Sequence, residues 1–422
     1  MTDTTRIPAR PWHGLGDAVT ILAPNPPDVT FSRFLDASHE SGAEPFAADR
    51  IAAIETLSSA FLAHPLLRQD AASTAAAFWM RRAQVTRLRE EWERRVQFEP
   101  GVVRVPVGRV LHIAPSNVDT LFLYSWVLSF LCGNANVVRL SQQRPVLVDA
   151  MLETIETLSR THEVLRQGDR FVTYAHDAEI TTALSQWCSH RVIWGGSETV
   201  AAIRPLALNP HASERVFGSK FSYSVFHAAG YGSAADADRT RVAQGMFNDL
   251  FWFDQMACSS PHVIFWVGGE ADVSAAIERL GSDLQSEADR RGFVPEASTA
   301  VLRRIFAFEL ALDADVGVRM DHPAFVEVRV RDAAGLTREY CGGGMLRHYR
   351  LDRLDDLAAL ANEGDQTVTH FGFDAASLHA LAARLGARGV DRVVPVGEAL
   401  AFDTVWDGFD LLDDFARRVR VR

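Results

Sequence analysis

Apolar residues recur every three or four positions through much of the first hundred residues. The segments DRIAAIETLSSAFLAH (49–64) and AASTAAAFWMRRAQVTRLREEWERRV (71–96) show this spacing, which is typical of amphipathic helices. The pattern changes in VVRVPVGRVLHIAP (102–115), which predicts a strand, a turn and a second strand. TLFLYSWVLSFLCG (120–133) is almost wholly apolar but too short to span a bilayer, so it predicts a buried core helix.

Short apolar strands then alternate with helical stretches. The next strand segments are GNANVVRLS (133–141), FVTYAH (171–176), RVIWGG (191–196) and SYSVFHA (222–228). Strands that alternate with helices at this spacing indicate an α/β fold with a doubly wound parallel sheet.

A second α/β region begins near residue 235. Its pattern predicts helices over 239–253 and 272–292 and strands at HVIFWVG (262–268), FVEVRVRD (325–332) and VDRVVPVG (390–397). No repeat period or low-complexity linker separates the two regions, so we expect them to pack together.

The composition is that of an ordinary globular protein, with 47% hydrophobic and 23% charged residues. The net charge of −11 argues against a nucleic-acid-binding surface, which is normally basic. Four scattered cysteines suit a reducing cytoplasm, and we expect no signal peptide. The fourteen histidines show no metal-ligand spacing, so we expect no metal. We also expect neither a membrane nor a nucleic acid as a partner.

The decapeptide FDQMACSSPH (253–262) places Cys258 among small and polar residues just before a proline. A free cysteine is most often a small buried hydrophobe, and the decapeptide alone favours that interpretation. The alternative is a nucleophile exposed on a loop and held by its neighbours. VIWGGSETV (192–200) is either a tight strand–helix turn or a helix N-terminus that faces a dinucleotide, and CGGGM (341–345) suggests a flexible loop.

Five segments occur in the order in which the aldehyde dehydrogenase superfamily carries its motifs: VGRVLHIAPSN, GNANVVRLS, IWGGSETV, FGSKFSYSVF and FDQMACSSP. FDQMACSSP, QTVTHFGF (366–373) and DRVVPVGEALAFDTVWDGFDLL (391–412) resemble more narrowly the fatty acyl-CoA reductase branch, of the LuxC type. The resemblance covers roughly residues 100–422. It implies an aldehyde-dehydrogenase-like α/β fold with a doubly wound, parallel-sheet cofactor domain and a second, catalytic α/β domain.

On this basis we expect three parts along the chain. Residues 1–234 hold the N-terminal helices and an NADP-binding Rossmann-like domain, and residues 235–395 form the catalytic domain with the cysteine. Residues 396–422 return to the cofactor domain or to an oligomer interface. We also expect a homo-oligomer, either a dimer or a tetramer, in the cytoplasm.

The resemblance implies that Cys258 is the nucleophile, which carries the substrate acyl group as a thioester. Asn117 matches the asparagine whose side-chain amide joins the Cys258 backbone N–H in an oxyanion hole. The alternative role for Asn117 is an N-cap of the helix at 120–133. Spacing alone assigns neither His262 nor His370 as the group that activates the thiol.

Arg139 stands where a lysine of the family contacts the adenosine ribose. The glutamate that excludes a 2′-phosphate is replaced around Gln142, and Arg139 and Arg144 flank that position. Loss of a carboxylate and gain of guanidinium groups favour NADPH over NADH, although the arginines could instead form a solvated surface pair. The other cofactor contacts that the resemblance implies are Ser141, Gly196 and Ser197.

Val216 occupies the position at which many aldehyde dehydrogenases carry a glutamate, the base for the water that hydrolyses the acyl-enzyme. A valine cannot act as a general base, so hydrolytic aldehyde oxidation is disfavoured. The predicted activity is therefore NADPH-dependent reduction of an acyl thioester, from acyl-CoA or an acyl carrier, to an aldehyde. The alternatives are an NAD(P)-dependent aldehyde dehydrogenase and a cofactor-free cysteine acyltransferase.

Overall fold

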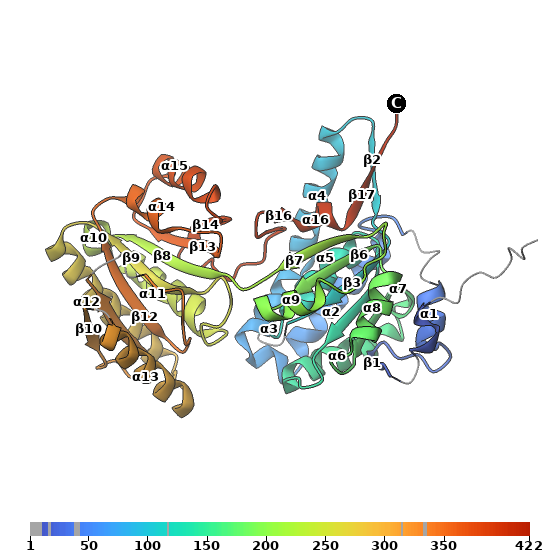
Figure 1. Cartoon of the computed structure of the whole chain (residues 1–422), viewed down its shortest axis with the longest axis horizontal. Helices are drawn as coiled ribbons and strands as arrows, with labels where there is room; N and C mark the ends of the chain where they lie inside the picture. Colours follow the sequence, from blue (N-terminus) through green and yellow to red (C-terminus); the bar gives the residue numbers. More distant parts are fainter. Residues whose placement is uncertain (1–10, 16–17, 38–42, 116–117, 314, 332–335) are drawn as a thin grey trace, which may run out of the picture. The chain divides into compact units, whose positions relative to one another are not determined.

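The computed structural model describes residues 11–15, 18–37, 43–115, 118–313, 315–331 and 336–422 (Figure 1). The chain divides into two compact units. The first unit comprises Met1–Gly218 and Phe409–Arg422, and the second comprises Ser219–Gly408.

The division between the units falls after Gly218 and not after residue 234, where the sequence pattern placed it. The reason is strand β8 (Phe221–His227), which pairs in parallel with β9 (Pro261–Val267) and β13 (Asp365–Phe371). Both partners come later in the chain, so β8 belongs to the second sheet. The C-terminal segment is divided too, because residues up to Gly408 stay with the second unit and the rest joins the first.

The first unit is built on a sheet with strand order β1-β5-β4-β3-β6-β7. β3 to β7 are parallel, and β1 joins the edge antiparallel to β5. This order is that of a doubly wound dinucleotide-binding sheet, whose direction of winding reverses between β3 and β6. The strands of the unit are β1 (Thr20–Ala23), β2 (Val102–Pro106), β3 (Arg109–Ile113), β4 (Ala135–Leu140), β5 (Asp169–Thr173), β6 (His190–Trp194), β7 (Ser213–Phe217), β16 (Phe409–Asp410) and β17 (Ala416–Arg420).

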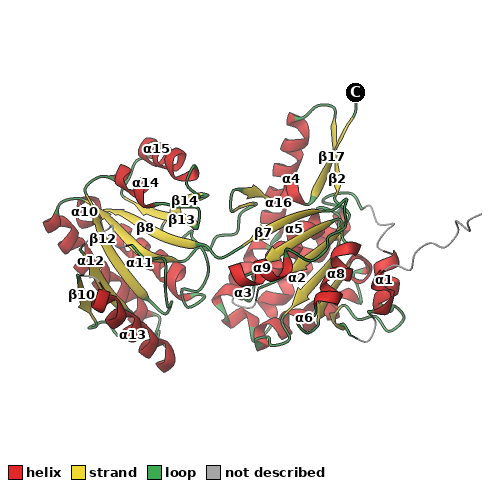
Figure 2. Cartoon of the chain, in the orientation of Figure 1, coloured by secondary structure: helices red, strands yellow, loops and turns green. Residues whose placement is uncertain are grey.

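Helices cover both faces of this sheet (Figure 2). Leu111 and Ile113 of β3 face a core completed by α8, α1 and the 3-10 turn η1, whereas His112 points to α5, with its Nδ1 2.8 Å from Ser125 Oγ. Residues 122–131 of α5 are all buried, which confirms the expected core helix. The helices are α1 (Phe31–Ala37), α2 (Ala48–Ala63), α3 (Ala71–Trp79), α4 (Arg82–Phe98), α5 (Leu121–Leu131), α6 (Val146–Ser159), α7 (Glu163–Gly168), α8 (Ala178–Trp187), α9 (Ser197–Ile203) and α16 (Leu411–Asp414), with 3-10 turns η1 (Pro11–Gly14) and η2 (Leu67–Gln69).

The second unit has a sheet of order β10-β11-β12-β9-β8-β13-β14, in which β10 alone is antiparallel to its neighbour. One face carries a core with α13, α14 and α15, and the opposite face carries a core with α10, α11 and α12. The remaining strands are β10 (Val316–Arg319), β11 (Val326–Val330), β12 (Met345–Leu351), β14 (Arg392–Pro395) and β15 (Val405–Trp406). The helices are α10 (Ala228–Gly232), α11 (Asp236–Phe251), α12 (Glu270–Arg290), α13 (Ala297–Asp313), α14 (Leu357–Leu360) and α15 (Ala375–Gly386), with the 3-10 turn η4 (Leu354–Asp356).

Strand β12 was not predicted from the hydrophobic pattern, because its sequence, MLRHYRL, contains three basic residues. Two of them are buried with partners: Arg347 Nη1 donates to Thr337 O at 2.8 Å, and His348 Nδ1 accepts from Trp266 Nε1 at 3.0 Å. Polar groups are tolerated inside a sheet when they are hydrogen-bonded in this way. In the described part of the chain, no helix has both the length and the apolar character that a membrane span requires.

Candidate active site

Cys258 lies on the loop that joins α11, which ends at Phe251, to β9. Asp254 and Gln255 have φ values of 50° and 61°, in the left-handed region that non-glycine residues avoid unless other contacts hold them. Cys258 itself is half-buried. The residue that the sequence singled out therefore sits on a segment whose conformation must be held from outside.

The Gln255 side chain, which is fully buried, supplies those contacts. Its Nε2 donates to Pro261 O at 2.7 Å and to Met345 O at 3.2 Å. Its Oε1 accepts from the backbone N–H groups of Gly344 and Met345, at 3.0 Å each. The amide thus ties the cysteine loop to the start of β12.

Three consecutive glycines, in the CGGGM segment (341–345), form the other side of this contact. Gly342, Gly343 and Gly344 have φ values of 71°, 67° and 78°. A Cβ on Gly342 would lie 2.6 Å from Met256 Sδ and 2.7 Å from Asp254 O. Glycine is needed here both for the backbone conformation and for the close approach of the two loops.

Polar residues from two neighbouring strands hold Cys258. Ser222 Oγ of β8 donates to Cys258 O at 2.7 Å and accepts from Thr367 N of β13 at 3.1 Å. Gln366 Nε2, also on β13, donates to Cys258 Sγ at 3.5 Å and makes a second hydrogen bond to Asp407 Oδ1. The sulfur therefore faces an amide donor that is itself fixed by a carboxylate.

The pKa of the Cys258 thiol is raised to about 11, mainly by burial and in smaller part by the nearby Asp407 carboxylate. The hydrogen bond from Gln366 and the charge of Arg392 act in the opposite direction. Burial also raises the pKa of Asp407, to about 6. The resting thiol is thus protonated at neutral pH, and any group that favours the thiolate has chemical value because the thiolate is the nucleophile.

His262, which the sequence left open as the activating base, is a packing residue. Its ring stacks on Tyr340 with centroids 3.9 Å apart and on Phe221 at 5.4 Å, and within the described residues neither ring nitrogen has a hydrogen-bond partner. The pKa of His262 is lowered to about 3, mainly by burial and in smaller part by the charge of Arg347, so the ring is neutral. His370 lies near the end of β13, where burial lowers its pKa.

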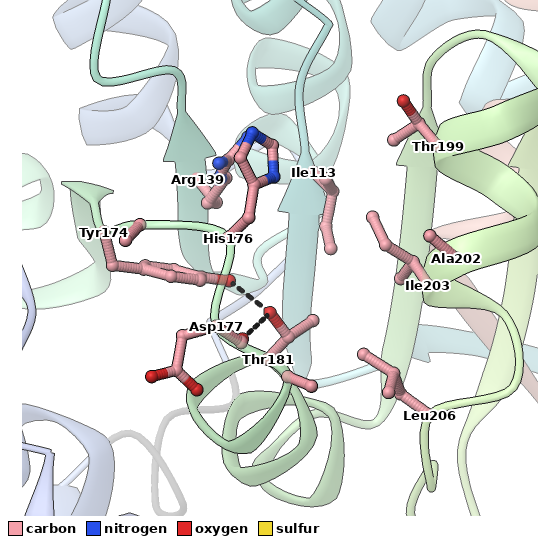
Figure 3. A pocket seen from close by; sticks show the side chains of 12 residues that line it. Ile113, Arg139, Tyr174, His176, Asp177, Thr181, Thr199, Ala202, Ile203 and Leu206 are labelled. Carbon is pink, nitrogen blue, oxygen red and sulfur yellow. Dashed lines mark hydrogen bonds between the residues drawn. The ribbon is translucent and has the colours of Figure 1, made fainter.

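A pocket of about 140 Å³ opens in the first unit at the carboxyl ends of β3, β4 and β5 (Figure 3). Figure 3 shows Arg139 and His176 together on one side of it, with Thr199 and Ile203 of α9 on the opposite side. A doubly wound sheet binds dinucleotides at this edge. The lining residues are Ile113, Arg139, Tyr174, Ala175, His176, Asp177, Ala178, Thr181, Thr199, Ala202, Ile203 and Leu206.

The two arginines predicted near the cofactor differ in their surroundings. Arg139 lines the pocket, with its guanidinium carbon 5.5 Å from the centre of the Tyr174 ring. Arg144 donates to Asp149 Oδ1 and to Ser141 O, at 2.9 Å each. Arg144 therefore holds the loop after β4, and Arg139 is the arginine of the pair that faces the pocket.

The remaining predicted site residues lie in the first unit. Gly196 is the N-cap of α9 and Ser197 is its first residue, two positions before Thr199 of the pocket wall. Val216 is half-buried in β7, where it pairs with Ile193 of β6. Asn117 lies outside the described residues. In the ranges that are described, no group of three or more His, Cys, Asp and Glu side chains is arranged to hold a metal ion.

Solved aldehyde dehydrogenase structures share the fold of this chain. A benzaldehyde dehydrogenase from Corynebacterium glutamicum matches with a TM-score of 0.63 and 15% identity, over 96% of this chain and 95% of that one. Aldehyde dehydrogenase 21 from Physcomitrella patens matches with a TM-score of 0.63 and 13% identity, over 92% and 89%. The chain thus has the aldehyde dehydrogenase fold, as its motifs predicted.

The acyl-CoA reductase (LuxC) family model matches residues 84–418, and the chain belongs to this family. The long-chain acyl-protein thioester reductase of Vibrio harveyi is 23% identical over 334 residues, 74% of this chain and 63% of the relative. That of Photorhabdus laumondii is 23% identical over 309 residues, 71% of this chain and 60% of the relative. The matches thus span less than two thirds of the length of these relatives.

Proposed function

We propose that the chain reduces an acyl thioester to an aldehyde, with Cys258 as the nucleophile and a nicotinamide cofactor as the hydride donor. The main observation behind the proposal is that the Cys258 thiol is half-buried on a loop held by hydrogen bonds, and that its sulfur accepts a hydrogen bond from Gln366. Cys132 and Cys188, by contrast, are fully buried. The family match and the names of the relatives support the same class of reaction.

The proposed reaction has two steps at Cys258. In the first step the thiolate attacks the thioester carbonyl, a new C–S bond forms, and the substrate thiol leaves. In the second step the acyl carbon accepts hydride, the bond to the Cys258 sulfur breaks, and the aldehyde departs. One acyl thioester, one hydride and one proton thus give one aldehyde and one thiol. Asn117 and the Cys258 N–H remain the proposed donors to the carbonyl oxygen.

The pocket of the first unit suits the adenosine half of a nicotinamide dinucleotide. Ile113, Ala202 and Ile203 provide apolar walls for the base, and Arg139 provides a cation for a ribose phosphate. When bound, the cofactor supplies hydride. We propose NADPH because Gln142 replaces a carboxylate and Arg139 can pair with the 2′-phosphate. We assign that role to Arg139 and not to Arg144, because Arg144 bonds to Asp149 and to the loop after β4. Ser141, Gly196 and Ser197 stay predicted contacts.

The acyl donor is proposed as a thioester of coenzyme A or of a carrier protein, since both present the same bond to Cys258. Val216 supports thioester exchange over hydrolysis, because a valine in β7 supplies no base for water. This residue weighs against the aldehyde-oxidising alternative. The cofactor pocket weighs against the acyltransferase alternative, which needs no dinucleotide. The homo-oligomer stays a prediction.

The test is a panel of acyl-CoA and acyl-carrier thioesters offered with NADPH or NADH, with cofactor absorbance followed and the product identified. We expect NADPH loss and aldehyde gain in equal amounts. Cys258→Ser should abolish both changes while NADPH still binds, and Cys341→Ser is the matched control because Cys341 is also half-buried. Acyl transfer with no use of cofactor would favour the acyltransferase, and full activity in Cys258→Ser would contradict the proposal.

A further inference from the structure

Gln366 is the second residue of β13, and its side-chain amide joins Cys258 to Asp407. Gln366 is fully buried and Asp407 is buried. An ionised carboxylate only accepts hydrogen bonds, so the end of the amide that meets Asp407 must be the NH₂ group. Because the same nitrogen lies 3.5 Å from Cys258 Sγ, its second N–H is directed at the sulfur.

We propose that Gln366 is a catalytic residue, which donates a hydrogen bond to the Cys258 sulfur whenever the sulfur carries negative charge. Asp407 is the positioning residue that keeps the Gln366 amide in this orientation. The proposal rests on the function proposed above. It assigns roles to two residues that lie 108 and 149 positions after the cysteine, and neither belongs to its loop.

Negative charge develops on the sulfur twice in the proposed reaction. The thiolate is the nucleophile when the C–S bond to the acyl carbon forms and the substrate thiol leaves. It is the leaving group when the reduced acyl carbon, having gained hydride from the nicotinamide cofactor, releases the aldehyde. A donor fixed beside the sulfur before the reaction stabilises both states without reorganisation.

The charges near the sulfur show why the donor matters. Asp407 opposes the thiolate electrostatically, and Arg392 favours it. Tyr340 is also within electrostatic reach of Cys258, and burial raises the pKa of its hydroxyl group. Asp407 therefore has two opposite effects, because its charge disfavours the thiolate and its hydrogen bond aims the Gln366 amide at the sulfur. The two effects can be separated by variants that keep or remove the acceptor.

The first measurement is the pH dependence of iodoacetamide alkylation, resolved by peptide mass spectrometry, in the wild type and in Gln366→Met. Loss of the donor should raise the apparent pKa of Cys258 by about one unit, so alkylation at pH 8 should slow by about tenfold. Cys341 is an internal control because burial raises its pKa to about 11 and its thiol hydrogen-bonds to Gly342 O. Its profile should not move, and Gln366→Leu is a second variant in case methionine disturbs folding.

The second measurement separates the two effects of Asp407. Asp407→Asn removes the charge but keeps an acceptor for the amide, so the pKa of Cys258 should fall. Asp407→Ala removes the charge and also removes the acceptor that holds the Gln366 amide. The pKa of Cys258 should therefore be higher in Asp407→Ala than in Asp407→Asn. In a Gln366→Met background this difference between the Asn and Ala variants should disappear. A difference that persists, or that never exists, would contradict the positioning role.

The alkylation profiles are interpreted together with acylation of the wild type, without cofactor, by a long-chain acyl-CoA and separately by an acyl-carrier-protein thioester. If Cys258 takes up an acyl group from neither donor, the proposed function fails, whatever the alkylation profiles show. If Cys258 is acylated but the Gln366→Met profile coincides with that of the wild type, the function stands and the role of Gln366 is wrong. Acylation together with a shifted profile supports both.

Discussion

Replacement of His262 by phenylalanine tests whether this histidine is only a packing residue. The phenyl ring keeps the stacking on Tyr340 and Phe221 and removes two buried ring nitrogens that have no partner among the described residues. A buried polar group without a partner costs about 1–3 kcal/mol, so the variant should be more stable at pH 7, by about 1 kcal/mol. If His262 were the base that activates the thiol, the variant would instead lose its activity.

The pH dependence of the same variant follows from the lowered pKa of His262. This pKa is about 3 in the folded chain and about 6.5 when unfolded, so below pH 6.5 the unfolded state binds the extra proton and the wild type loses stability. Each pH unit below 6.5 costs about 1.4 kcal/mol. At pH 5 the advantage of His262→Phe should therefore have grown by about 2 kcal/mol relative to pH 7.

The assay is urea unfolding of the wild type and His262→Phe at pH 7 and pH 5, followed by circular dichroism. Only the difference between the two proteins is used, because the contributions of other titrating groups cancel in it. Reductase activity is measured at pH 7 on the same samples. A stability difference that does not change with pH would refute the assignment of a neutral, buried ring. Loss of activity in a folded variant would refute the packing role.

Three further substitutions test the loop, the cofactor pocket and the fate of the acyl group. Gln255→Ala should lower the free energy of unfolding by about 3 kcal/mol, since two buried N–H groups lose their acceptor, whereas the exposed control Gln167→Ala should cost under about 1 kcal/mol in urea titrations. Arg139→Ala should weaken NADPH about 10- to 100-fold and NADH far less in fluorescence titrations; equal losses for both would contradict the 2′-phosphate contact. Val216→Glu should increase free acid among the products of aldehyde, NADP⁺ and coenzyme A, whereas rapid acid formation by the wild type without coenzyme A would show that another base acts.

The sequence was sufficient where structure is local. Helix periodicity predicted α2, α11 and α12, and apolar runs predicted β3, β4, β6 and β9. These elements follow from spacing along the chain, which is visible without a fold. The ordered motifs then predicted both the aldehyde dehydrogenase fold and the family, because several short matches in one order constrain topology more than any single match.

The sequence was insufficient where structure depends on residues far apart. Gln366 lies next to Cys258 because β13 pairs with β8, and Asp407 of the segment after β14 lies next to Gln366. No local sequence pattern predicts either contact. The contact made by the three glycines after Cys341 is not visible in the sequence for the same reason, since their partner is a loop about 90 residues earlier. The segment QTVTHFGF, which contains Gln366, was part of the family resemblance. Within it, His370 was considered as the activating group and Gln366 was not.

The domain boundary shows how pairing overrides spacing. SYSVFHA follows the first-unit strands closely in sequence, so it was grouped with them, yet its hydrogen bonds go to β9 and β13. The strand before it, β7, was missed because SERVF is polar at three of its five positions and only Phe217 is buried. An edge strand with few apolar residues gives little signal, and the predicted boundary therefore falls after residue 234, beyond β8 and α10.

The central claim, that Cys258 carries the acyl group, is tested most directly by mass spectrometry of the wild type after incubation with a long-chain acyl-CoA and no cofactor. We expect a single adduct of the acyl mass on the peptide that contains Cys258, discharged as aldehyde when NADPH is added. An adduct on Cys341 or elsewhere, or an adduct at Cys258 that NADPH does not discharge, would contradict it.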